Sequence, residues 1–126
     1  MIPRMLDHIG FTVGDYDRSK AFYERALAPL GIELLLEWPG QAAGFGEGGK
    51  PFFFLETRPP TVTGVHVAFA VDDRQTVHAF HAAALEAGGT DNGAPGPREI
   101  YHPHYYGAYV LDPDGNNIEA VCHKPA

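Results

Sequence analysis

The chain has 126 residues, of which 44% are hydrophobic and 20% charged, and its formal net charge is −7 at pH 7. This length and composition predict one compact globular domain over residues 1–126. The negative charge and the lack of a basic cluster in the sequence argue against nucleic acid or an anionic membrane as a partner. The single cysteine, Cys122, excludes an internal disulfide framework, and no stretch is apolar enough for a signal peptide or a membrane span. We therefore expect a cytoplasmic protein.

The first half of the chain predicts a strand, a helix and three further strands. Apolar and polar residues alternate over residues 6–13, which is the period of a half-buried strand. The apolar spacing that follows predicts a helix that begins after Asp15 or Asp17 and ends at Pro29. Residues 32–57 are strand-like and are interrupted by Gly and Pro turns, which is typical of an antiparallel meander. The predicted order is βαβββ.

The second half predicts the same order of elements. A strand is expected over residues 65–71, and Asp72 or Asp73 can cap the helix that follows it. Gly88 and Gly89 stop that helix, and residues 90–98 are so rich in Gly, Pro and Asn that we expect turns there. Strand character is expected over three later runs, with an Asp-Gly turn between the last two: 99–102, 106–111 and 117–122.

The two halves also share a repeated sequence. Residues 8–27 and 66–85 align without a gap at a constant offset of 58, and eight of the 20 positions are identical. A duplication of one βαβββ unit explains this similarity, with repeat units over 5–57 and 64–122.

Each unit places a histidine at the same point of its first strand, His8 and His66. A strand histidine is often a half-buried, hydrogen-bonded residue, and that interpretation stays open for each of them. A pseudo-twofold axis between the units would bring both imidazoles to one place, and a metal ion is the simplest reason for such convergence. Glu119 and Glu56, each in the last strand of its unit, are the candidate carboxylates. Matching them requires five extra residues, which fall in 90–98; a solvated strand residue is the alternative for both.

A third group of residues lies in the stretch between Glu99 and Tyr106, which reads EIYHPHYY. We expect a lid over the metal, in which His102 or His104 acts as acid or base and tyrosines orient the substrate. The candidate substrate-binding residues are Tyr101, Tyr105 and Tyr106. The alternative is an aromatic loop packed over the end of a sheet.

The runs HIGFTV and HVAFAV and the closing LDPDGNNIEAV resemble the vicinal oxygen chelate superfamily, which includes lactoylglutathione lyases, extradiol dioxygenases and bleomycin-resistance proteins. The resemblance covers nearly the whole chain. It implies an α+β, glyoxalase-like fold in which two βαβββ units form curved mixed sheets around a metal-binding cleft. It also implies one divalent ion bound by His8, His66 and Glu119, with Glu56 as a fourth ligand where members use one. Among Ni, Zn, Fe, Mn and Mg the sequence does not distinguish.

This resemblance leaves three functions open. The first is lactoylglutathione-lyase-like lyase or isomerase chemistry on a small substrate held through two neighbouring oxygens, with Glu56 or Glu119 moving the proton. The second is an Fe(II) extradiol-type dioxygenase, with an acid/base histidine from the stretch that holds His102 and His104. The third is a metal-free protein that sequesters a drug.

Assembly is the last expectation from the sequence. A four-stranded unit leaves a sheet face and sheet edges to be covered, and the connection over residues 58–64 is short. The apolar run Phe52-Phe53-Phe54 suits an interface. We therefore expect a homodimer whose site is shared, with His8 (and Glu56, if it binds) from one chain and His66 and Glu119 from the other.

Overall fold

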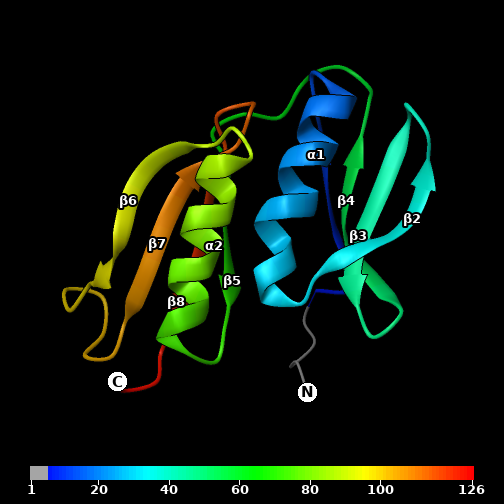
Figure 1. Cartoon of the computed structure of the whole chain (residues 1–126). Coiled ribbons are helices and arrows are strands. Elements are labelled where there is room, and N and C mark those ends of the chain that lie inside the picture. Colours follow the sequence, from blue (N-terminus) through cyan, green and yellow to red (C-terminus); the bar gives the residue numbers. More distant parts are fainter. Residues whose placement is uncertain (1–5) are drawn as a thin grey trace.

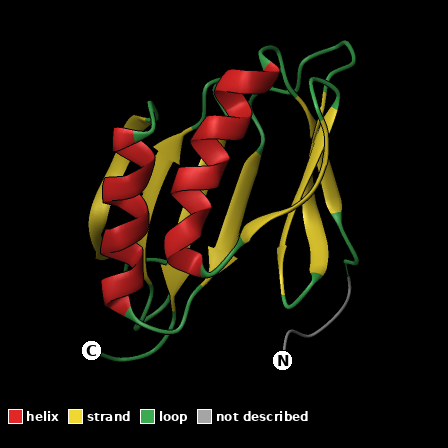
Figure 2. Cartoon of the chain, turned by 45° about the vertical axis from the view of Figure 1, so that its right-hand side comes forward, coloured by secondary structure: helices red, strands yellow, loops and turns green. Residues whose placement is uncertain are grey.

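The computed structural model describes residues 6–126, so the predicted start of the first unit at residue 5 lies outside the described residues. These residues form two four-stranded sheets, each with a helix against one face (Figures 1 and 2). The first unit contains β1 (Ile9–Thr12), α1 (Tyr16–Leu27), the 3-10 helix η1 (Ala28–Leu30), β2 (Glu33–Trp38), β3 (Ala42–Glu47) and β4 (Lys50–Glu56). The second unit contains β5 (His66–Ala70), α2 (Arg74–Glu86), β6 (Thr90–Pro97), β7 (Tyr106–Leu111) and β8 (Asn117–Cys122). The α+β fold of two tandem βαβββ units, predicted from the sequence, is confirmed.

Both sheets have the same topology. Their strand orders are β1-β4-β3-β2 and β5-β8-β7-β6. In each sheet the first strand of the unit runs parallel to the last one, and the other neighbours are antiparallel. In each unit the repeated histidine lies at the start of the first strand: His8 directly precedes β1, and His66 is the first residue of β5. The strand order puts that strand directly beside the one that carries the candidate glutamate.

The helix starts follow the capping rule at equivalent positions of the repeat. Asp15 rather than Asp17 caps α1, and Asp73 rather than Asp72 caps α2. Each side chain accepts a hydrogen bond from the backbone amide three residues further on, at 3.1 Å in α1 and 2.7 Å in α2. A carboxylate there satisfies one of the amides that the first turn of a helix leaves unpaired. None of the helices in the described part of the chain is long and apolar enough to cross a membrane.

The core lies between the sheets and the helices, and the repeat supplies it symmetrically. Phe22 and Phe80 are fully buried, as are the equivalent Ala26 and Ala84. The two helices lie side by side, which joins the units along their lengths (Figure 2). Gly89, just after α2, permits this close approach, because a Cβ atom there would lie 2.7 Å from the ring of Phe22.

The prediction of turns over residues 90–98 was wrong, because β6 occupies Thr90–Pro97 and the loop lies after it. The strand survives its Gly and Pro content because it is at the edge of the sheet and pairs only with β7. The pairing register shifts at Gly93, where the φ angle of 153° and the ring of Tyr109 leave little room for a side chain. Composition alone therefore indicated turns where tertiary pairing makes an irregular strand.

A buried hydrogen bond also connects the units. The Tyr23 hydroxyl on α1 donates to Asp112 Oδ2, 2.5 Å away, in the turn between β7 and β8. Both residues are buried, and burial raises the pKa of Tyr23 well above its ordinary value, so the phenol stays a donor across the usual pH range. Asp112 also accepts hydrogen bonds from the backbone amides of Asp114 and Asn116.

Replacing Tyr23 with Phe is expected to lower the free energy of unfolding by about 1–3 kcal/mol, since one buried carboxylate oxygen loses a donor. Urea unfolding followed by circular dichroism measures this change. Tyr101→Phe is the matched control, because Tyr101 is 62% exposed and should shift the free energy of unfolding by less than about 0.5 kcal/mol. Equal unfolding midpoints for Tyr23→Phe and the wild type would contradict the prediction.

Candidate functional site

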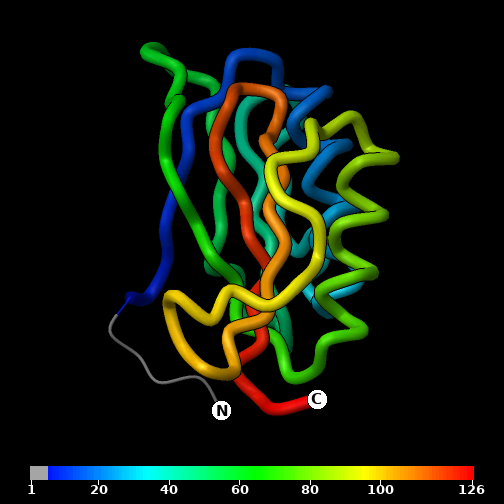
Figure 3. The backbone as a smooth tube through the Cα atoms, turned by 90° about the vertical axis from the view of Figure 1, so that its left-hand side faces the viewer, coloured from blue at the N-terminus to red at the C-terminus, as the bar shows by residue number. Residues whose placement is uncertain are grey.

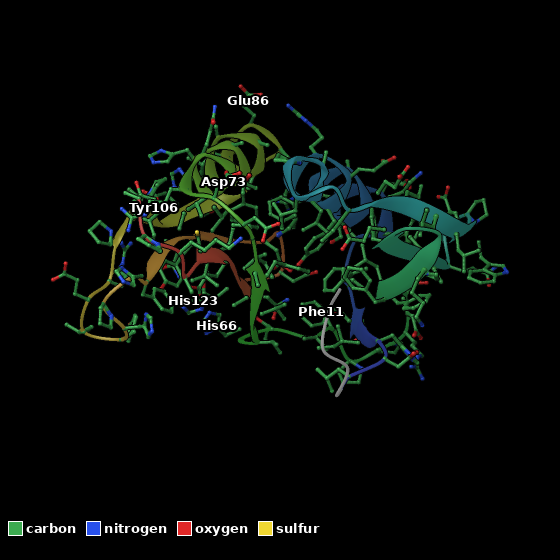
Figure 4. All side chains as sticks on the ribbon, turned by 90° about the horizontal axis from the view of Figure 1, so that it is seen from below. Phe11, His66, Asp73, Glu86, Tyr106 and His123 are labelled. Carbon is green, nitrogen blue, oxygen red and sulfur yellow. The ribbon has the colours of Figure 1, made fainter. Side chains whose placement is uncertain are left out.

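Each sheet has an open face, which is the face that its helix does not cover. On β5, Val67 and Phe69 pack against the core, so the alternation of the strand turns His66 and Ala68 to the open face. Glu119 on β8 lies opposite Ala68 in the parallel register and therefore shares that face. Figure 4 shows His66 on the side of the second sheet away from α2.

The open face of the second sheet holds a histidine–glutamate pair. His66 Nε2 lies 2.7 Å from Glu119 Oε1, and the Glu119 side chain is buried while the imidazole is half-exposed. The Tyr105 hydroxyl donates a hydrogen bond to the other oxygen, Oε2. Burial, followed by this hydrogen bond, raises the pKa of Tyr105 above its ordinary value, so the phenol remains protonated. One oxygen of Glu119 thus faces His66 and the other faces Tyr105.

The open face of the first sheet carries a looser set. His8, Gly10, Phe54, Glu56 and Arg58 line an open hollow of about 390 Å³. His8 Nδ1 lies 2.9 Å from a carboxylate oxygen of Asp7, and Glu56 pairs with the Arg58 guanidinium at 2.9 Å. The histidine and the glutamate of this sheet therefore share a hollow, but each interacts with a charged neighbour rather than with the other.

The strand register corrects the predicted equivalence of Glu56 and Glu119. Glu119 lies opposite Ala68, whose counterpart in the first unit is Gly10, and the residue opposite Gly10 is Phe54. Glu56 is two residues further along the strand, opposite Thr12. Phe54 rather than Glu56 is therefore the structural counterpart of Glu119, and its ring packs edge-on to the ring of His8 at 5.5 Å.

Glu56 nevertheless reaches back toward the hollow. Its Oε2 atom would lie 3.5 Å from a Cβ atom placed on Gly10, so the missing side chain at Gly10 leaves room for the carboxylate. Glu56 is also more accessible to solvent than Glu119, with a side chain that is 38% exposed.

The predicted ligands are not all brought together within one chain. Over residues 6–126, no three His, Cys, Asp or Glu side chains are close enough to hold one ion. The structure places His66 with Glu119 on one open face and His8 with Glu56 on the other. One chain thus presents two separate halves of the predicted set.

Of the predicted residues in the loop between β6 and β7, only Tyr105 forms a hydrogen bond to Glu119 within the described part of the chain. The ring of His102 packs against His104 and against His123, at centroid distances of 6.1 and 5.5 Å. Tyr105 also packs against His123, at 5.2 Å. Figure 3 shows this loop at the same end of the second sheet as the C-terminus.

Two of the predicted tyrosines lie elsewhere. Tyr106 belongs to the helix side of the sheet, where its hydroxyl is 2.7 Å from His78 Nε2 and its ring lies 4.6 Å from the Arg74 guanidinium. Figure 4 places it close to α2. Tyr101 is largely exposed and contacts the ring of Tyr105 at a centroid distance of 5.1 Å. The structure does not bring Tyr106 to the open face.

Three residues around the His66–Glu119 pair were not predicted from the sequence. Tyr109 lies opposite Glu119 in the β7–β8 register, and Asn117 lies opposite His66. His123 directly follows β8 and packs on the loop. The alternation of β7 and β8 would have placed Tyr109 and Asn117 on the face of Glu119, whereas nothing in the sequence indicated the position of His123.

The donor atoms on the open faces fit a divalent ion. Imidazole nitrogen and carboxylate oxygen are the ligands that Zn, Ni and Fe(II) take in proteins. In the described chain the buried Asn117 Oδ1 has no hydrogen-bond partner, although Asn117 lies opposite His66. A buried acceptor needs a partner, and beside this half-exposed imidazole a bound ion, its water or a substrate would supply one.

Comparison with known proteins agrees with this fold. The family model described as Glyoxalase/Bleomycin resistance protein/Dioxygenase superfamily matches residues 5–120. A crystal structure of a glyoxalase/bleomycin resistance protein from Albidiferax ferrireducens has a TM-score of 0.82 and 31% sequence identity, covering 97% of this chain and 100% of that chain. No curated protein sequence matches.

Two structures with named activities are more distant. A glyoxalase I variant from Zea mays has a TM-score of 0.67 and 27% identity, over 92% of this chain and 45% of that chain. A lactoylglutathione lyase from Agrobacterium tumefaciens has a TM-score of 0.69 and 22% identity, over 96% of this chain and 95% of that chain. At that identity the second similarity concerns the fold alone.

Proposed function

Because the chain belongs to the glyoxalase/bleomycin resistance protein/dioxygenase superfamily, we propose that it is a metal-dependent enzyme with lactoylglutathione-lyase-like lyase or isomerase chemistry. Its substrate is a small molecule that presents two neighbouring oxygens. The observation that carries this proposal is the buried Glu119, whose Oε1 atom faces His66 Nε2 at 2.7 Å on an open face. The similarity to the maize glyoxalase I supports the choice of chemistry.

The metal centre is completed by a second copy of the chain. His8 comes from one subunit, and His66 and Glu119 come from the other, because a single described chain does not bring three such ligands together. The open face of the first sheet also exposes Trp38 by 53% and Leu36 by 41%. Exposed apolar side chains beside a predicted ligand fit a face that another subunit covers.

The three ligands and Glu56 have different tasks in this proposal. A bound divalent ion would act as a Lewis acid and stabilise negative charge on the two substrate oxygens. His8, His66 and Glu119 hold the ion. The first unit supplies no ligand equivalent to Glu119, because Phe54 occupies the corresponding position. Glu56 transfers the substrate proton, because its carboxylate is more accessible to solvent than that of Glu119. Its exposed ion pair with Arg58 costs little free energy to break.

A second function, that of an Fe(II) extradiol-type dioxygenase, is supported by two observations. Two histidines and one carboxylate make the ligand set of many non-haem iron oxygenases, and the register leaves the first unit without a counterpart of Glu119. The cluster of His102, His104 and His123 adjoins Tyr105, and it could supply an acid/base imidazole.

Elemental analysis of protein purified without chelator tests the proposal. Nickel or zinc, together with conversion of the hemithioacetal of methylglyoxal and glutathione or a related α-hydroxycarbonyl compound, is expected for the lyase or isomerase. Iron, together with oxygen consumption on a catechol, would support the dioxygenase instead. Protein that neither retains nor takes up any metal would contradict both and would support sequestration.

The proton carrier gives a further prediction that separates the two enzymes. In the lyase or isomerase, Glu56→Gln is expected to lower kcat by about 100-fold or more, whereas His104→Ala leaves kcat within about threefold of the wild type. Metal content should stay unchanged in both variants, since neither residue is a proposed ligand. Steady-state kinetics with metal analysis of the same samples provides the measurement. A large loss in His104→Ala alone would assign the acid/base role to the loop and favour the dioxygenase.

A further inference from the structure

The hydrogen bonds of the Glu119 carboxylate divide its two oxygens between different partners. Oε1 lies 2.7 Å from His66 Nε2, and Oε2 accepts a hydrogen bond from the Tyr105 hydroxyl. The glutamate itself is 0% exposed, so water does not compete for these positions. The hydrogen bond from Tyr105 holds Oε2 of this buried carboxylate, and it leaves Oε1, beside His66, as the oxygen better placed to bind an ion.

The position of Tyr105 is defined by the loop and the strand on either side of it. Its backbone amide donates to the carbonyl of His102 at 3.1 Å, and its carbonyl accepts from the amide of Arg98 at 2.7 Å. Its ring makes edge-on contacts with the rings of Tyr101 and His123, at centroid distances of 5.1 and 5.2 Å. These contacts close the base of the loop over residues 98–105 and hold the phenol against Glu119.

Gly107 makes the approach of the phenol to the carboxylate feasible. A Cβ atom at this position would lie 3.1 Å from Glu119 Oε2 and 3.3 Å from the Tyr105 ring. Both distances are shorter than an ordinary van der Waals contact. Because Gly107 has no side chain, the Tyr105 hydroxyl can approach the Glu119 carboxylate without a steric clash.

We propose that Tyr105 is a positioning residue for the metal centre. It holds Glu119 Oε2, so that Oε1 alone faces the ion beside His66, and it links the loop over residues 98–105 to metal binding. This inference rests on the proposed metal centre. Residues that orient a metal ligand through a hydrogen bond typically change metal affinity by about 10–100-fold when they are removed.

A purely structural role for Tyr105 predicts a different pattern. If the hydroxyl only satisfies a buried acceptor, Tyr105→Phe lowers the free energy of unfolding but leaves metal affinity unchanged. If the hydroxyl positions Glu119, the dissociation constant for the ion rises as well. Metal affinity is therefore the measurement that separates the two roles, and it does not depend on knowing the substrate.

The experiment measures Zn²⁺ and Ni²⁺ binding to the apo form of the full chain by isothermal titration calorimetry. Tyr105→Phe is expected to raise the dissociation constant about 10–100-fold. Tyr101→Phe is the matched control, because its ring contacts Tyr105 but is 62% exposed. That control should stay within about twofold of the wild type, since it removes no hydrogen bond to Glu119.

Glu119→Gln distinguishes failure of this inference from failure of the metal centre. Loss of metal binding in Glu119→Gln with wild-type affinity in Tyr105→Phe would overturn the role of Tyr105 and leave the centre intact. Wild-type affinity in Glu119→Gln would overturn both.

A measurement on the wild-type chain covers the case in which Tyr105→Phe does not fold. Hydrogen exchange at the amides of Arg98 and Tyr105 should slow when Zn²⁺ is added. The ion holds Glu119 in place, and Glu119 is hydrogen-bonded to Tyr105. Exchange at these amides that Zn²⁺ leaves unchanged would contradict the link between the loop and the centre.

Discussion

Glu119→Gln is expected to abolish stable metal binding and to lower kcat/KM about 1,000-fold, because a Lewis-acidic ion contributes several kcal/mol to the transition state. The substitution keeps the size of the side chain, and it replaces a buried carboxylate with a neutral amide next to His66. An amide oxygen is a much weaker ligand for zinc or nickel than a carboxylate. Metal analysis and steady-state kinetics on the same preparation measure both effects.

Glu86→Gln provides the control for removal of one negative charge. Glu86 is exposed at the end of α2 and pairs with Arg25 at 3.3 Å, so its substitution should leave metal content and turnover unchanged. A Glu119→Gln protein that keeps a full complement of metal together with wild-type turnover would contradict the assignment of Glu119 as a ligand.

The local features of the fold were predictable from the sequence because each depends on neighbouring residues. The repeat indicated two βαβββ units, and an acidic side chain before an apolar helical pattern limited each cap to two aspartates, of which Asp15 and Asp73 are the caps in the structure. The same repeat aligns Phe22 with Phe80, and both are fully buried. Glu119 lies on the face of β8 opposite the core residues Ile118 and Ala120, as the alternation of side chains along a strand indicates.

Features that depend on strand pairing could not be read in the same way. The irregular β6 exists because β7 lies beside it, and its register shifts at Gly93 are not encoded by a local pattern. Glu56 appeared to match Glu119 because each lies in the last strand of its unit. The register shows that the counterpart of Glu119 is Phe54, since the alignment of parallel strands depends on the packing of the whole unit.

The partners of the candidate site depend on tertiary structure to an even greater degree. Tyr105 and Tyr106 are adjacent in the sequence, yet one contacts Glu119 and the other contacts His78 on α2. Adjacent residues near a strand point to opposite faces, so only the position at which β7 begins decides which tyrosine reaches the glutamate. Likewise, each histidine could be assigned to a face, but the distance between the two faces is a property of how the units pack.

The proposal of a shared site predicts recovery of activity when two inactive variants are combined. His8→Ala and Glu119→Ala should each be inactive alone, because each removes a proposed ligand from both sites of a homodimer. When the two chains are co-expressed with different tags, a mixed dimer contains one site with both substitutions and one site with neither. Random pairing makes about half of the dimers mixed, so about a quarter of the wild-type activity per subunit is expected.

The matched control for this experiment combines His66→Ala with Glu119→Ala. Both residues belong to the same half of the set, where they lie 2.7 Å apart in one chain, so every shared site in a mixed dimer keeps one defect and no activity should return. Recovery with the first pair and none with the second would require His8 to act with the second unit of another chain. If both combinations stay inactive while the mixed dimers form, the site is built within one chain and the shared arrangement is wrong.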